Sequence, residues 1–473
     1  MTSTHGPLTI ERDRLRALDE TIAGEVLTAH SEGSEAFRAA SSLYYRHLDR
    51  TPALVVRPRD TDDVAAAVAF ARASGLEIAV RGGGHSLAGH STVEDGLVID
   101  LHHLDRIEID VDERVARVGG GATAGAVTAA AGDHGLVIGF GDTGSVGVGG
   151  ITLGGGAGFV SRAHGLTIDN LLAVELVTAE GRVVVADADH HPDLFWALRG
   201  GGGGFGVATK FTFRLRSLPQ VVGGMLVVPA TVDTVTEFVR LAQAAPEELS
   251  AMINVMPAPP MPFLPKEQHG QLVVLALLTY AGPAAAAEPV LAPFRAVATP
   301  LADLLHEMPY PGMFQPEPED FHPIATIRTG FSRGFDRSHA QLILDTLTKR
   351  LASPDLQMAI VNTRVLGGAI SRVSPDTTAY AHREWPLMVN VAAVVGDPQA
   401  LDEQRPWIEA LGASLSEGTP GAYGNFVGDE GPDRIHDIYP PETYARLARV
   451  KAEWDPDNVF HRGHTVPPER PAG

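Results

Sequence analysis

Cysteine is absent from the 473 residues of this sequence. Its absence excludes disulfides, thiolate metal sites, catalytic thiols and a thioether bond to a cofactor. Basic residues are scarce, with 37 Lys and Arg against 58 Asp and Glu, for a formal net charge of -21. This balance repels phosphate backbones and anionic membrane surfaces, so we expect neither nucleic acid nor a membrane as a partner.

Long apolar segments are missing too. The N-terminal stretch MTSTHGPLTIERDRLR lacks the apolar core of a secretory signal. No stretch of about 18 uncharged apolar residues predicts a membrane span, and the apolar run at 272–278 fits a buried strand. We therefore expect a cytoplasmic protein. No metal is predicted, because the histidine pairs at 102–103 and 190–191 are adjacent and cannot both face one ion from a strand.

The length exceeds one ordinary core and predicts at least two domains of an α+β protein. Residues 1–50 are polar and Ala-rich, which indicates a helical lead-in. Residues 51–219 have an α/β pattern, and 220–415 form a second α+β domain with prolines clustered at 257–265 and 309–323. Residues 416–473 are a separate C-terminal segment.

Local signals predict several elements. A helix follows the capping pair Asp60–Thr61 and ends at Gly75. Further helices are expected at 124–134 and 441–454, a hairpin at 171–187, and strands at 206–219, in QLVVLALLTY and in WPLMVNVAAVV. The tetrapeptide DPDN at 455–458 is typical of a turn that ends the helix before it.

Two glycine-rich stretches carry the chemistry. RGGGHSLAGHS, 81–91, follows a strand and offers backbone N–H groups that suit a pyrophosphate. It is neither GxGxxG nor a Walker loop. Spacing alone leaves a plain turn as the commoner interpretation of three glycines. His85 within it is either an exposed turn histidine or a nucleophile beside a cofactor, since a neutral imidazole nitrogen is a good nucleophile.

The second stretch, 139–158, holds ten glycines in twenty residues, interleaved with Val, Ile, Leu and Phe. This composition differs from a flexible linker and indicates backbone pressed against a large flat or phosphate-bearing ligand. Arg162, His164, Asp169 and Asn170 follow. Each of these four, taken singly, is more typical of a solvated or capping residue than of a ligand contact.

Five motifs occur in order: RGGGHSLAGHST, SVGVGGITLGGGAGFVSRAHGLTIDNL, ELVTAEGRVV, PDLFWALRGGGGGFGVAT and YGNF…DPDNVF. Together they span about 50–470 and resemble the berberine bridge enzyme-like group of the vanillyl-alcohol oxidase family, in the bacterial branch that includes 6-hydroxy-D-nicotine oxidase. The resemblance implies a two-lobed fold, in which a PCMH-type FAD-binding domain and the C-terminal tail hold FAD, and a substrate domain with an antiparallel sheet covers the flavin ring.

The resemblance also implies residue roles. His85 matches the histidine that bonds the flavin 8α-methyl. Thr143 stands where many members carry a second, cysteinyl attachment, so a single bond is expected. Val146 stands where a small residue accompanies oxygen access. The FAD-binding residues implied in this way are Arg81, Gly82, Gly83, Gly84, His85, Ser86, Gly89, Thr143, Gly144, Val146, Gly147, Gly150, Gly154, Gly155, Gly158, Asp169, Asn170, Val207, Tyr423 and Asn425.

On the substrate side, Tyr380, His382 and Arg383 resemble a segment whose alternate residues face the flavin, while an ordinary strand with a solvated polar face is an equal interpretation. Tyr423 and Asn425 resemble the tail motif beside the flavin. Tyr423, His382 and Tyr380 are the catalytic candidates, with Tyr423 as a base whose pKa Arg383 or a protonated His382 lowers. The tail departs from the family at 463–465, where Gly-His-Thr replaces Asn-x-Asn.

The sequence therefore predicts an oxidase that transfers hydride from a small-molecule alcohol, sugar or amine to flavin N5, with O2 as acceptor and H2O2 as product. One alternative is a flavin-dependent dehydrogenase or oxygenating biosynthetic enzyme that uses another acceptor or a flavin–oxygen adduct. A second is a non-catalytic flavin-binding protein. The specific substrate and the oligomeric state are not encoded in these motifs.

Overall fold

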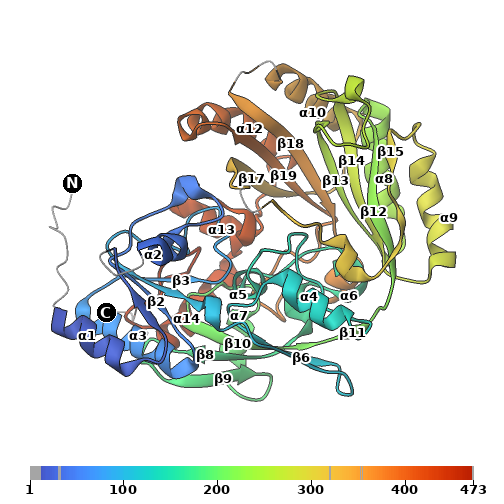
Figure 1. Ribbon diagram of the computed structural model, residues 1–473. Helices are drawn as coiled ribbons and strands as arrows, with labels where there is room; N and C mark the ends of the chain where they lie inside the picture. The colour runs from blue at the N-terminus through green and yellow to red at the C-terminus, as the bar shows by residue number, and fades with distance from the viewer. Residues whose placement is uncertain (1–11, 30–33, 319–320, 352, 354, 471–473) are drawn as a thin grey trace.

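The computed structural model describes residues 12–29, 34–318, 321–351, 353 and 355–470, and they form two lobes (Figure 1). The lower lobe contains the blue and green strands together with the red C-terminal helices. The upper lobe is built on one large sheet whose colours run from green through yellow to orange. Mixed helix and sheet in two lobes, with an antiparallel sheet in the upper lobe, confirms the predicted fold class.

A four-stranded sheet begins the lower lobe. Its strand order is β1 (Glu25–Leu27), β2 (Leu54–Arg57), β4 (Leu97–Asp100) and β3 (Ile78–Arg81), and the last three strands are parallel. Helix α3 (Thr61–Ser74) begins at Asp60, whose side chain accepts from the backbone N–H of Asp63, and it ends at Gly75 with φ +65°. The predicted helix is thereby confirmed at both ends.

The segment predicted as a helical lead-in also contains a strand. Helices α1 (Arg12–Thr21) and α2 (Ser34–Ser41) do occur, but β1 lies between them and pairs with β2. Residues 1–11 and 30–33 of this lead-in lie outside the described residues. The lead-in therefore contributes one strand to the first sheet.

A second, five-stranded antiparallel sheet completes the lower lobe. Its order is β5 (Ile107–Asp110), β6 (Val115–Gly119), β10 (Val207–Arg214), β8 (Leu171–Val177) and β9 (Val183–Asp187). The last two strands confirm the predicted hairpin. The segments that connect these strands contain the short helices α4 (Ala124–Gly132), α5 (Val148–Leu153), α6 (Ser161–His164) and α7 (Pro192–Leu198). A small strand pair joins β7 (Leu136–Val137) to β11 (Arg216–Ser217).

The upper lobe holds an eight-stranded antiparallel sheet. Its strands are β15 (Ala302–Asp303), β12 (Val221–Pro229), β14 (Leu272–Tyr280), β13 (Leu249–Pro257), β18 (Leu356–Val365), β19 (Leu387–Val395) and β17 (Ile324–Ser332), with β16 (His306–Met308) beside β12. Alternating residues such as Ala251, Ile253 and Val255 pack in one hydrophobic core with helices α8 (Val232–Ala244), α9 (Ala284–Arg295), α10 (Arg337–Arg350) and α12 (Leu401–Leu415). The intervening residues therefore face away from these helices, on the other side of the sheet.

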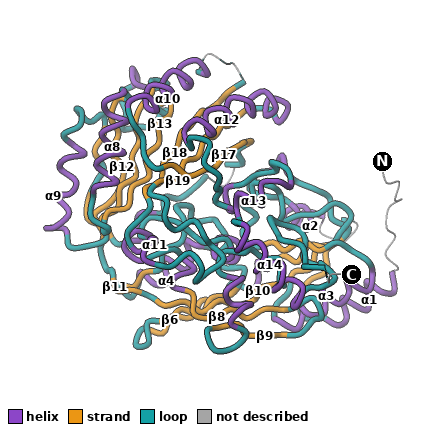
Figure 2. The backbone as a smooth tube through the Cα atoms, turned by 180° about the vertical axis from the view of Figure 1, so that it is seen from behind, coloured by secondary structure: helices purple, strands orange, loops and turns teal. Residues whose placement is uncertain are grey.

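The chain then returns to the lower lobe. Helices α13 (Ile435–Ile438) and α14 (Pro441–Trp454) lie there (Figure 2). Helix α14 packs against α7. The helix predicted at 441–454 is confirmed. The turn after it is held by Lys451, which is buried and donates to the Asp455 carboxylate at 2.6 Å and to the Phe460 carbonyl at 2.9 Å.

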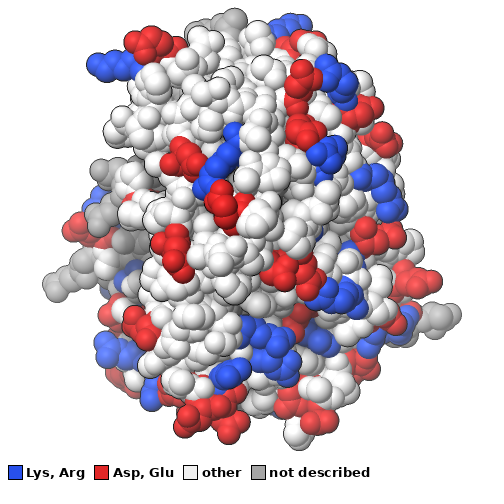
Figure 3. All heavy atoms as spheres, turned by 90° about the vertical axis from the view of Figure 1, so that its right-hand side faces the viewer, with Lys and Arg blue, Asp and Glu red and all other residues white. Residues whose placement is uncertain are grey.

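On the face drawn in Figure 3, basic and acidic side chains lie interspersed, with wide uncharged areas between them. In the ranges that the structure describes, no helix is long and apolar enough to cross a membrane. The same ranges contain no group of three His, Asp or Glu side chains placed to share a metal ion.

Candidate active site

A cavity of about 380 Å³ lies within the lower lobe, and Arg364 of β18 in the upper lobe reaches its wall. Its walls come from the turn after β3, from the glycine-rich stretch around α5, from 200–208 and from the C-terminal segment. Fifteen of its 42 lining residues are glycine. Such a wall is mostly bare backbone, which suits close contact with a large ligand.

Twelve of the predicted cofactor residues lie together in this wall: Gly82, Gly83, Gly84, His85, Ser86, Thr143, Val146, Gly147, Gly150, Gly154, Tyr423 and Asn425. The first five follow β3 and the next group flanks α5, as the motifs predicted. Segments more than 300 residues apart in the chain therefore meet around one space.

His85 is held on two sides. Its ring stacks on Tyr44, with ring centroids 4.1 Å apart and planes 24° from parallel. The imidazole also hydrogen-bonds the Ser145 backbone. Burial lowers the pKa of His85 to about 4, so the ring is neutral at physiological pH. A neutral imidazole retains one nitrogen lone pair, as a nucleophile requires.

Two glycines show where the cavity wall is closely packed and where it borders open space. A side chain on Gly83 is excluded, because an added Cβ would lie 2.3 Å from the Gly147 backbone nitrogen. The His85 turn is thus packed directly on the loop before α5. Gly150, by contrast, has nothing within 4 Å of an added Cβ, although it stands inside a helix. Because no protein atom requires glycine there, the open space fits a flat group lying against the helix.

Tyr423 lies at the far wall, buried, with its hydroxyl accepting from the Gly156 N–H and from Asn425 Nδ2, each at 2.9 Å. Burial raises the pKa of Tyr423, while these two donors and the charge of Arg364 act to lower it. Tyr380 lies edge-on at 6.1 Å between ring centroids, and its buried hydroxyl has no hydrogen-bond partner among the described residues. Burial raises the pKa of Tyr380 as well.

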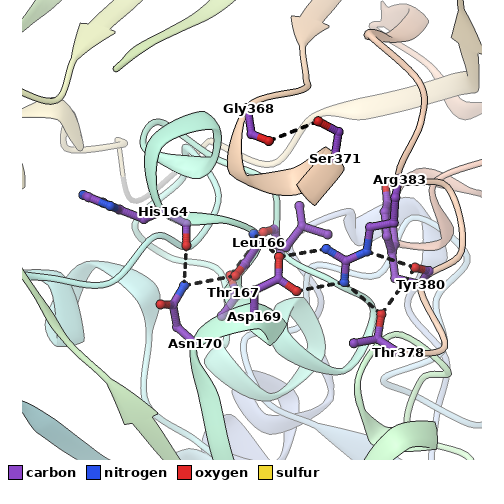
Figure 4. A network of polar contacts seen from close by, with 11 residues as sticks. His164, Leu166, Thr167, Asp169, Asn170, Gly368, Ser371, Thr378, Tyr380 and Arg383 are labelled. Carbon is purple, nitrogen blue, oxygen red and sulfur yellow. Dashed lines mark hydrogen bonds and ion pairs between the residues drawn. The ribbon is translucent and has the colours of Figure 1, made fainter. Parts of the chain in front are cut away.

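The prediction that Arg383 or a protonated His382 lowers the pKa of Tyr423 is wrong. Arg383 is 1% exposed and makes two 2.8 Å hydrogen bonds to Asp169, as Figure 4 shows. His382 is buried, its Nε2 hydrogen-bonds the backbone oxygens of Asp437 and Ile438, and burial lowers its pKa. His382 is therefore neutral. The positive charge that acts on Tyr423 is Arg364.

The strand interpretation of this segment is also wrong, because the regular strand starts only at Leu387. The side chains of Tyr380, His382 and Arg383 are buried in irregular chain, not solvated. Tyr380 and His382 stand outside the cavity lining, together with Arg81, Gly89, Gly144, Gly155, Gly158, Asp169, Asn170 and Val207.

Several of the predicted residues outside the cavity lining form hydrogen bonds or ion pairs within the protein. Asn170 donates to the backbone oxygens of His164 and Leu166, and Asp169 is the ion-pair partner of Arg383 (Figure 4). Arg81 donates to the Ala40 carbonyl and lies 3.5 Å from Asp100. The sequence offered the capping alternative for Asp169 and Asn170, and the contacts fit it.

Sequence reasoning missed two residues of the wall. Tyr44 precedes the first motif, and Arg364 lies inside a strand, so neither carries a local signal. The departure at 463–465 was noticed, and Gly463, His464 and Thr465 all line the cavity. There His464 meets His90 edge-on, with ring centroids 4.8 Å apart.

Comparison with known proteins agrees with this geometry. Residues 52–187 match the family model described as FAD binding domain, and 422–467 match the model Berberine and berberine like. The chain is 31% identical over 434 residues to an uncharacterized FAD-linked oxidoreductase of Bacillus subtilis, covering 89% of this chain and 93% of that protein. It is 30% identical to (R)-6-hydroxynicotine oxidase of Paenarthrobacter nicotinovorans, covering 95% and 98%.

Solved structures are similar too. Crystalline 6-hydroxy-D-nicotine oxidase from Arthrobacter nicotinovorans superposes with a TM-score of 0.82 at 28% identity, over 95% of this chain and 98% of that one. Glucooligosaccharide oxidase from Acremonium strictum, described with a 6-S-cysteinyl, 8α-N1-histidyl FAD, gives 0.82 at 25% identity over 97% and 99%.

The fold and the site define an FAD-linked oxidoreductase. Within that class, the chain belongs to the berberine bridge enzyme-like family of oxidases.

Proposed function

We propose that FAD is joined to this chain by a single bond to His85, and that the enzyme oxidises a small-molecule alcohol, sugar or amine with O2 as acceptor and H2O2 as product. When bound, FAD accepts hydride from the substrate C–H at N5 and passes the electrons to O2. The observation that carries the proposal is the neutral, doubly held His85 in the same glycine-walled cavity as Tyr423.

A single bond follows from the side chains available. The glucooligosaccharide oxidase relative is described with both a cysteinyl and a histidyl link. Here Thr143 lines the cavity near His85, and the chain has no cysteine. A threonine hydroxyl is a far weaker nucleophile than a thiolate, so only the histidyl link remains.

We assign the removal of the substrate proton to Tyr423. Removing hydride from an alcohol or amine carbon requires loss of the O–H or N–H proton as well. The Tyr423 oxygen accepts two hydrogen bonds at 2.9 Å, and both would stabilise its anion. Arg364 adds a positive charge on the same side.

The attachment is tested by acid precipitation. The yellow colour should stay with the protein, and a tryptic peptide that contains residue 85 should carry the flavin mass. In His85→Ala the colour should appear in the supernatant instead. Flavin released by acid from the unchanged chain would refute the covalent bond.

The acceptor is tested separately on the dithionite-reduced enzyme. Mixing with air-saturated buffer should consume O2 and release an equal amount of H2O2. Slow reoxidation by O2 together with fast reoxidation by a quinone dye would identify a dehydrogenase. Bleaching of the flavin under anaerobic conditions, with a panel of alcohols, sugars and amines, then defines the substrate class.

A further inference from the structure

The carboxylate of Glu317 bridges two groups that the proposed function leaves without a role. Glu317 lies in the segment between the 3-10 helix Tyr310–Met313 and β17, which belongs to the upper lobe. Its Oε1 accepts from the Tyr44 hydroxyl at 3.0 Å, and its Oε2 accepts from the Ser145 hydroxyl. One side chain of the upper lobe therefore connects two segments of the lower lobe.

Both segments contact His85. Tyr44 covers one face of the imidazole, and its backbone N–H donates to the Gly84 carbonyl at 3.1 Å. Ser145 meets the ring through its backbone. The face and the edge of one imidazole ring are thus fixed by residues that share a single carboxylate.

We propose that Glu317 and Tyr44 are positioning residues for flavin attachment. Tyr44 holds the His85 ring directly, and Glu317 holds Tyr44 and Ser145, so that the ring keeps the orientation that forms the covalent bond. This inference rests on the proposed function, in which His85 is the attachment residue. Neither Glu317 nor Tyr44 forms the bond itself.

The chemistry depends on this orientation. Attachment replaces one 8α C–H hydrogen and the imidazole N–H hydrogen by a C–N bond. The two electrons and two protons released reduce O2, the acceptor named above, to H2O2. The lone pair of one imidazole nitrogen must point at the 8α carbon while the ring proton is held elsewhere. A misplacement of about 1 Å in such a reaction costs about 100-fold in rate.

The same segment makes a second contact with Tyr44, because a ring nitrogen of His322 lies 3.1 Å from the Tyr44 carbonyl oxygen.

Glu317 is exposed, so its loss should leave folding almost unchanged. This makes Glu317→Ala a fair test. Full-length protein is produced with limiting riboflavin and then incubated with FAD in air. Total flavin is measured by absorbance after desalting, and acid-stable flavin is followed over time in the precipitated protein.

We expect Glu317→Ala and Tyr44→Phe to bind FAD as the unchanged chain does, but to form acid-stable flavin at least about ten-fold more slowly, within the loss typical of misorientation. The double variant should be no slower than either single one, because both break the same connection. Glu267→Ala removes an exposed glutamate of the same lobe that does not line the cavity, and should behave as the unchanged chain.

Glu317→Gln separates geometry from charge. The amide oxygen can accept from Tyr44, and the amide N–H can donate to the Ser145 hydroxyl, which also accepts. Glu317→Gln should therefore recover most of the attachment rate. A rate in Glu317→Ala equal to that of the unchanged chain would refute the inference, as would a Gln variant as slow as Ala. Acid-stable flavin in His85→Ala would instead refute the proposed attachment site.

Discussion

Arg364 and Asp142 form an ion pair between the lobes, with 2.7 Å from Nη2 to Oδ2. Arg364 projects from β18 of the upper lobe, and Asp142 lies in the glycine-rich stretch of the lower lobe. The same guanidinium donates to the Ala157 carbonyl and lies over the Phe426 ring at 4.8 Å. Arg364 is therefore fixed from several sides beside the cavity that contains Tyr423.

This pair predicts opposite shifts for two variants. Arg364→Met removes the positive charge that lowers the pKa of Tyr423. The pKa at which anaerobic flavin reduction rises with pH should therefore increase by about 1 unit or more. Asp142→Asn leaves Arg364 without its counter-ion and should lower that pKa. Stopped-flow reduction across a pH series measures both. Shifts in the same direction would show that the pair acts on packing and not on Tyr423.

Tyr423→Phe keeps the ring and removes the hydroxyl. If Tyr423 takes the substrate proton, anaerobic flavin reduction should slow by about 100-fold or more, the usual cost of losing a general base. The rise of the reduction rate with pH that marks deprotonation of Tyr423 should disappear from the profile. Tyr380→Phe is the matched control, because that hydroxyl is buried without a partner and stands outside the cavity lining. Unchanged reduction in Tyr423→Phe would assign the proton to another group.

Val146 lines the cavity with a short branched side chain. Val146→Leu adds one methylene to this wall and should slow reoxidation by O2 while leaving anaerobic reduction by substrate nearly unchanged. The two half-reactions are measured separately by stopped flow. Equal slowing of both would show a general packing defect instead of restricted oxygen access.

The lowered pKa of the buried His90 ring predicts that the protein loses stability in acid. Burial lowers its pKa from 6.5 to about 3, so the ring is neutral when folded. Between these values the unfolded chain binds one more proton than the folded chain, and the free energy of unfolding falls as pH falls through this window. His90→Gln should remove up to about 1.4 kcal/mol of this loss per pH unit. Urea unfolding at several pH values between these limits, with exposed His190→Gln as control, measures the difference.

Lys451 and Asp455 form a buried ion pair, with Asp455 fully buried. Lys451→Met keeps the length of the side chain but leaves the Asp455 carboxylate without its cation. We expect a loss of about 3–5 kcal/mol in the free energy of unfolding, as when one partner of a buried pair is removed. The double change Lys451→Met with Asp455→Asn should recover part of it. A small loss in the single variant would mean that the backbone N–H groups of Val459 and Phe460 satisfy the carboxylate alone.

Elements with strong local signals were predictable. Asp60 and Gly75 bound a helix because capping and left-handed backbone are encoded by one residue each. The hairpin at 171–187 was predictable because the turn at Glu180–Gly181 separates two apolar runs, and these runs pair as β8 and β9. The lead-in was less predictable, because β1 has three residues and forms only by pairing with β2, which is a tertiary contact.

Site residues were predictable from the sequence where backbone contact requires glycine. They were less predictable where a long-range ion pair sets the role of a charged side chain. Gly83 and Gly147 are demanded by backbone contact, so their spacing is visible in the sequence. Arg383 and Arg364 are both arginines in the upper lobe, and only the fold shows that the first pairs with Asp169 and the second reaches the cavity. The pKa environment of Tyr423 follows from such long-range placement and has no local sequence signal.

The return of the chain to the lower lobe bears on how the enzyme is made. Tyr423, Asn425 and His464 complete a cavity that begins at Tyr44. During synthesis, a ribosome must therefore release almost the whole chain before the wall around the cofactor can close. FAD capture is expected only after translation ends, and a ribosome-stalled chain that stops before residue 420 should emerge without tightly held flavin.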